Sequence, residues 1–90
     1  MSNLTQTQSR ILVVEDEAII AETIQEILVS MGYIVTGIAD TGMKAILDFF
    51  ATDPDLILMD IRLKGSMDGI QAAEKIRTHK AVPIVFLTAN

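Results

Sequence analysis

Three short apolar runs each end in a polar side chain, and this pattern constrains the fold more than any other feature of the chain. The runs and the residues that follow them are 11–14 with Glu15 and Asp16, 56–59 with Asp60, and 84–87 with Thr88. Continuous runs rich in Val and Ile are typical of parallel strands that are buried on both faces. The carboxyl ends of parallel strands meet at one edge of the sheet, so we expect these polar groups to gather there.

The segments between these runs show helical spacing of apolar residues. The expected strands cover 10–14, 33–38, 55–59 and 82–87, and the expected helices cover 18–31, 43–50 and 69–79. Gly32 is suited to end the first helix in a left-handed conformation. Asp68 and Gln71 stand three residues apart and predict a capping box at the start of the third helix. The alternation indicates an α/β fold with a doubly wound parallel sheet and right-handed crossovers.

The domain organisation follows from length and composition. Residues 1–9 are polar and are expected to form a flexible N-terminal tail, and residues 10–90 are expected to form one small domain. Half of the residues are hydrophobic, which makes a packed core possible. We expect Met31, Met43 and Met59 to fill that core, because Met adapts to irregular gaps.

Charge and cysteine content exclude several classes of function. The net charge of −5 argues against a nucleic-acid surface, because binding to phosphates needs a basic face. The absence of cysteine excludes disulfides, zinc–thiolate sites and thiol catalysis. The first nine residues lack the apolar core of a signal peptide, and no apolar stretch approaches the roughly 18 residues of a membrane span. We therefore expect this domain to contact neither nucleic acid nor membrane.

The three carboxylates at the expected sheet edge predict a metal site. Glu15, Asp16 and Asp60 would repel one another, and a cation relieves that repulsion. Ligands that are all oxygen suit a hard ion such as Mg²⁺. Taken alone, an acidic pair is also typical of a first helical turn, and Thr88 of a strand-end cap. Asp60 has no such simple explanation, because an idle charge directly after four apolar residues is costly.

Taken in order, these residues resemble the receiver domain of two-component response regulators. The stretches that carry the resemblance are 11–17, 55–60, 67–69 and 82–89. It implies a flavodoxin-like sheet with strand order 2-1-3-4 and a site at the sheet edge where the order of the strands reverses. This family is itself a standard example of the rule that ligands bind at such a point.

The resemblance implies a role for each polar residue. Asp60 would accept a phosphoryl group from a histidine kinase or a phosphotransfer protein. Asp16, Asp60 and the backbone carbonyl of Arg62 would bind Mg²⁺, with support from Glu15. The Thr88 hydroxyl would donate a hydrogen bond to the phosphoryl group. The domain would then be a cytoplasmic signalling module, and not an enzyme beyond slow self-dephosphorylation.

The resemblance also implies a fifth strand with a lysine and two further helices. The chain stops at Asn90, so we expect a receiver fold that is incomplete after its fourth strand. The apolar strand 82–87 would then lie at an edge, where Pro83 protects only its start. We expect self-association through this edge.

Two other functions stay open at this point. A phosphatase with an Asp nucleophile usually has a second carboxylate close after it, and Arg62 at that place argues against this function. The other alternative is an interaction module, or an incomplete fragment, that is not phosphorylated.

Overall fold

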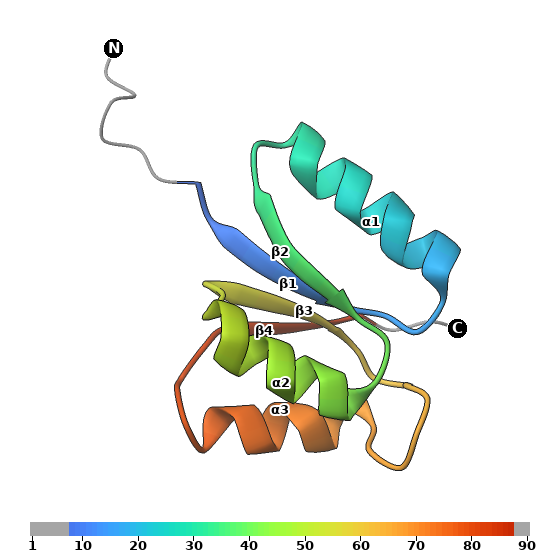
Figure 1. The fold of residues 1–90 in the computed structure, drawn as a ribbon, viewed down its shortest axis with the longest axis vertical. Helices are drawn as coiled ribbons and strands as arrows, with labels where there is room; N and C mark the ends of the chain where they lie inside the picture. The colour runs from blue at the N-terminus through green and yellow to red at the C-terminus, as the bar shows by residue number, and fades with distance from the viewer. Residues whose placement is uncertain (1–7, 88–90) are drawn as a thin grey trace.

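The computed structural model describes residues 8–87, which form four strands and three helices. The elements are β1 (Arg10–Val14), α1 (Ala18–Ser30), β2 (Ile34–Ala39), α2 (Gly42–Thr52), β3 (Leu56–Asp60), α3 (Gly69–Arg77) and β4 (Ile84–Leu87). All strand pairings are parallel, in the order β2-β1-β3-β4, so the predicted fold class and strand order are confirmed. Helix α1 covers one face of the sheet, and α2 and α3 cover the other (Figure 1).

The central strand β1 is the most deeply buried element. It pairs with β2 on one side and β3 on the other, and Leu12, Val13 and Val14 are completely buried. Strand β4 has a described neighbour on one side only, and Val85 is 47% exposed. Continuous apolar runs therefore mark the strands correctly, while the degree of burial depends on position in the sheet.

The helix ends follow the expected chemistry. The Gln71 N–H donates to Asp68 Oδ1 at 2.8 Å, and the Asp68 N–H donates to Gln71 Oε1 at 3.0 Å, which confirms the capping box. Gly32 follows α1 with a φ of +94°, as a C-terminal cap requires. Helix α3 ends at Arg77, two residues earlier than predicted. The Thr41 hydroxyl caps α2 by accepting from the Lys44 N–H at 3.0 Å.

The main core lies between the sheet and the pair α2 and α3. Its buried members are Leu12, Val14, Ala39, Ala45, Phe49, Ile57, Met59, Ala72, Ile76 and Val82. Met59 fills the core as predicted, but the prediction for Met31 and Met43 is wrong, because both are more than half exposed. Met31 lies beyond the last residue of α1. Met43 lies off the face of α2 that Ala45 and Phe49 turn toward the sheet.

Candidate functional site

The polar residues at the carboxyl ends of β1 and β3 lie together at one edge of the sheet. Val14 pairs with Met59 in register, so the residues that come next in the two strands are neighbours. Carboxylate oxygens of Glu15, Asp16 and Asp60 all lie within 4.8 Å of one another. The clustering expected from the strand ends is therefore present.

Glu15 is the most unusual member of this cluster, because it is a charged side chain with only 6% of its surface exposed. Burial raises its pKa above the ordinary value of 4.5, and the nearby charge of Asp60 raises it further. The Glu17 N–H opposes this shift by donating to Glu15 Oε2 at 3.1 Å. A cation would relieve the repulsion that remains among the three neighbouring carboxylates, so the cluster is electrostatically suited to one.

The start of α3 is packed directly against the end of β3. The Gly69 N–H donates to the Ile61 carbonyl at 2.7 Å, and Gly69 is buried. A Cβ atom at this position would collide with the carbonyl oxygen of Asp60. Glycine is therefore required for the close approach of the helix to the strand end that carries Asp60. We did not predict this role for Gly69, whose place after Asp68 indicates only a helix start.

A hollow beside the cluster is lined by both carboxylates and lysines. Its lining includes Glu15, Asp16, Lys44 and Lys64. Lys64 comes from the loop between β3 and α3, and that loop forms an isolated parallel bridge with Thr41 at the start of α2. Neither lysine was predicted to lie at the site, because no local pattern in the sequence indicates that this loop pairs with the β2–α2 turn.

The predicted roles of two further site residues, Arg62 and Thr88, stay predictions. Arg62 is an exposed residue of the loop after β3, and its carbonyl as a metal ligand stays a prediction. Thr88 lies outside the described residues. The residue before it, Leu87, pairs in register with Asp60.

The donor set of the cluster fits a hard divalent cation. All three side chains offer carboxylate oxygens, and residues 8–87 contain neither cysteine nor a histidine near the cluster. Mg²⁺ is typically bound through few protein oxygens while it keeps several waters, and Asp16 and Asp60 are only partly buried. Within the described residues, no helix is both long and apolar enough to span a membrane.

Known proteins are similar to this chain in sequence and in fold. The family described as the response regulator receiver domain matches residues 11–90. The transcriptional regulatory protein PdtaR of Mycobacterium tuberculosis is 40% identical over 80 residues, which are 89% of this chain and 38% of that protein. The transcriptional regulatory protein CseB of Streptomyces coelicolor is 37% identical over 83 residues, 92% of this chain and 35% of that protein.

Solved structures that are similar to this chain also come from response regulators and receiver domains. The response regulator PhyR from Brucella abortus superposes with a TM-score of 0.88 at 34% identity, over 94% of this chain and 35% of that chain. The receiver domain of a diguanylate cyclase from Desulfovibrio desulfuricans gives a TM-score of 0.87 at 34% identity, over 93% and 67% of the two chains. This chain spans little more than a third of the length of the relatives PdtaR and CseB. It belongs to the family of response regulator receiver domains.

Proposed function

We propose that this receiver domain accepts a phosphoryl group on Asp60 in a two-component phosphorelay, with Mg²⁺ as cofactor. The observation that supports the proposal most is the cluster of Glu15, Asp16 and Asp60, whose oxygens lie within 4.8 Å of one another. Asp60 is partly buried at the end of β3, so its carboxylate is held by the sheet and is still open to a donor.

The residues of the cluster have distinct roles in this reaction. Glu15, Asp16, Asp60 and the Arg62 carbonyl would hold Mg²⁺, which offsets the negative charge of both reactants. A carboxylate oxygen of Asp60 attacks the phosphorus of a phosphohistidine, and the N–P bond breaks with its electron pair returning to the histidine nitrogen. The product is an acyl phosphate on Asp60. The Thr88 hydroxyl then donates a hydrogen bond to a phosphoryl oxygen.

The partner in this proposal is a histidine kinase or a phosphotransfer protein, and the reaction is located in the cytoplasm. PhyR from Bartonella quintana, a structural neighbour at 34% identity, has been crystallised in complex with the anti-sigma factor NepR. We therefore propose protein partners for this domain as well. The net charge of −5 speaks against direct contact with nucleic acid. The domain signals by its phosphorylation state and is not proposed to turn over a substrate.

Intact mass spectrometry with a small phosphodonor tests this function. Purified protein is incubated with acetyl phosphate in the presence of Mg²⁺, and a second sample contains a chelator in place of the metal. We expect a gain of one phosphoryl group that requires Mg²⁺ and is absent from Asp60→Asn. Rapid release of phosphate over many turnovers would instead support the phosphatase, and no adduct in either sample would support the interaction module without phosphorylation.

A further inference from the structure

The loop between β3 and α3 carries one of the proposed metal ligands. It covers residues 61–68 and contains Arg62, whose carbonyl is the proposed ligand. The base of the loop is closed, because the Gly69 N–H donates to the Ile61 carbonyl at 2.7 Å. Its tip turns at Gly65, which has a φ of +92° and no described atom within 4 Å of a Cβ placed there. The position of the Arg62 carbonyl therefore depends on what holds the rest of the loop.

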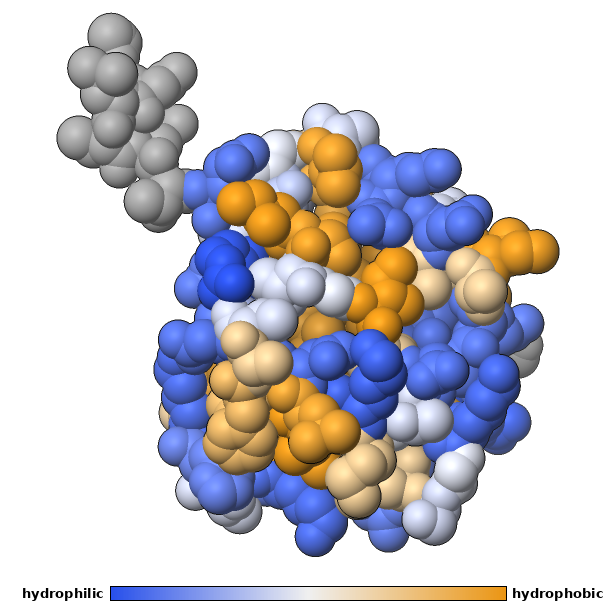
Figure 2. Space-filling model, in the orientation of Figure 1, coloured by the Kyte–Doolittle hydropathy of each residue, from blue (hydrophilic) through white to orange (hydrophobic). Residues whose placement is uncertain are grey.

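Helix α2, which lies beside this loop, is supported from its inner side. Ala45 and Phe49 are buried in the core, whereas Met43 and Leu47 are 58% and 61% exposed on the outer side. Figure 2 shows apolar surface, in orange and pale orange, in the lower half of the view, where α2 lies in Figure 1. The core therefore fixes the place of α2, and the start of this helix can serve as a support for the loop.

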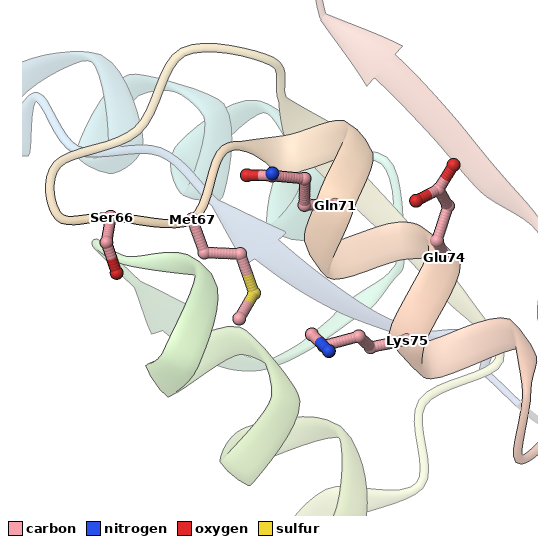
Figure 3. Close-up of a pocket in the computed structure, with 5 residues that line it drawn as sticks. All are labelled: Ser66, Met67, Gln71, Glu74 and Lys75. Carbon is pink, nitrogen blue, oxygen red and sulfur yellow. The ribbon is translucent and has the colours of Figure 1, made fainter.

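The start of α2 meets the loop at two consecutive residues. Thr41 forms an isolated parallel bridge with Lys64. A Cβ at Gly42, which is buried, would lie 3.0 Å from the Met67 carbonyl oxygen and 3.1 Å from both Met67 Cβ and Cγ, which is tighter than ordinary contact. Figure 3 shows the Met67 side chain extending from the loop into the space between α2 and α3, and this side chain packs against the core. Glycine at this position therefore lets the helix and the loop approach closely. We call Thr41, Gly42, Lys64 and Met67 the loop contact.

The same stretch of chain is also fastened to the carboxylate cluster. The Glu15 N–H donates to the Ala39 carbonyl at 2.9 Å, which ties the end of β2 to the first acid of the cluster. Two residues further on, Thr41 forms its bridge to the loop. Residues 39–42 therefore connect Glu15 with the loop that follows Asp60, so one short segment contacts the chain on both sides of the site.

We propose that Gly42 is a positioning residue for the metal site. By giving room to Met67 it holds the loop, and with the loop the Arg62 carbonyl, beside the carboxylates. This inference rests on the proposed function, in which the cluster and Arg62 bind Mg²⁺. Gly42 is not itself a proposed ligand, so its influence on the ion passes through the loop. Mutation of groups that hold metal ligands in place typically costs about 10–100-fold in metal affinity.

Two variants weaken the loop contact from its two sides. Gly42→Ala adds a methyl group on the helix side, and Met67→Ala shortens the side chain on the loop side without adding a clash. Gly37→Ala is the matched control, because a Cβ there would make ordinary contacts at 3.6 and 3.8 Å. Val82→Ala is a second control, which opens the core at the opposite edge of the sheet from the carboxylates. NMR titration measures the Mg²⁺ affinity of each folded protein, and hydrogen exchange measures the loop in the metal-free state.

We expect the Mg²⁺ affinity and the exchange rates of the loop to change together. Gly42→Ala should bind Mg²⁺ roughly tenfold more weakly than wild type, and the amides of residues 61–67 should exchange faster in its metal-free state. Met67→Ala should shift both quantities in the same direction, which decides the matter even where Gly42→Ala fails to fold. Gly37→Ala and Val82→Ala should keep the wild-type affinity, although Val82→Ala is less stable, because both lie away from the loop contact.

Wild-type Mg²⁺ affinity in both Gly42→Ala and Met67→Ala would overturn the positioning role. An equal loss of affinity in Val82→Ala would also overturn it by tracing the effect to general stability, as would a loss in Gly42→Ala without faster exchange in the loop. A wild-type chain that binds no Mg²⁺ would contradict this inference together with the metal site. A wild-type chain that binds Mg²⁺ but gains no phosphoryl group from acetyl phosphate would contradict the proposed phosphoryl transfer alone, and the comparison of affinities would still decide the role of Gly42.

Discussion

The close approach of α3 to the end of β3 makes a sharp prediction for Gly69→Ala. A Cβ at this position would meet the Asp60 carbonyl oxygen, its carbonyl carbon and the Ile61 Cα, all of them backbone atoms. The strand end cannot move freely, because Asp60 pairs in register with Leu87. The start of α3 must therefore shift, which also strains the bond from the Gly69 N–H to the Ile61 carbonyl.

The size of the effect can be estimated from these contacts. Overpacking a tight site costs about 1–3 kcal/mol, and loss of the 2.7 Å backbone hydrogen bond costs about 1 kcal/mol more. The better helix propensity of alanine returns at most about 1 kcal/mol. We therefore expect a net loss of about 2 kcal/mol in the free energy of unfolding, which lowers the melting temperature by roughly 8–16 °C in a domain of this size.

Thermal and urea unfolding followed by circular dichroism measure this loss. Gly37→Ala is the control, because a Cβ there would meet Asp48 Oδ2 at 3.6 Å and Leu12 Cδ1 at 3.8 Å, which are ordinary contacts. We expect this control to stay within about 0.5 kcal/mol of wild type. A Gly69→Ala protein as stable as the control would show that the packing of α3 against β3 is looser than the structure indicates.

Other variants test the metal site, the helix cap and the sheet edge. Asp16→Asn should weaken Mg²⁺ binding more than Glu15→Gln in an NMR titration, and equal affinities in wild type and Asp16→Asn would contradict the metal assignment. Burial raises the pKa of Glu15 in the folded state, so the metal-free protein should lose stability as the pH rises through that pKa. Glu15→Gln removes this loss. In urea unfolding at several pH values, the free energy of unfolding of this variant relative to wild type should therefore increase with pH. Asp68→Ala should cost about 1 kcal/mol in urea unfolding through loss of the capping box, and an unchanged stability would argue against the cap. If β4 self-associates through the edge that has no neighbour among residues 8–87, Val85→Lys should reduce aggregation at high protein concentration in light scattering, and an unchanged scattering signal would exclude that edge.

The parts of the fold that depend on local patterns were predictable from the sequence. Continuous apolar runs indicate buried strands wherever they occur, and their carboxyl ends meet at one edge in any parallel sheet. The clustering of Glu15, Asp16 and Asp60 follows from these two facts alone. The capping box was equally predictable, because Asp68 and Gln71 interact within a single helical turn.

The features that depend on distant contacts were not predictable. The bridge between Thr41 and Lys64 joins two loops that share no sequence signal, so the lysines beside the carboxylates were missed. The exposure of Met43 was missed for a related reason, because hydrophobicity alone does not tell which side of a short helix meets the sheet. The role of Thr88 stays a prediction, since this residue lies outside the described part of the chain.

Mapping the phosphoryl group to one residue tests the central claim most directly. Protein treated with acetyl phosphate and Mg²⁺ is reduced with borohydride, which converts a phosphorylated aspartate to homoserine, and the product is sequenced by tandem mass spectrometry. We predict homoserine at position 60 and unmodified side chains at Glu15 and Asp16, the other two members of the cluster. Homoserine at Asp16, or at none of these positions despite a gain in mass, would contradict the assignment of Asp60 as the phosphoacceptor.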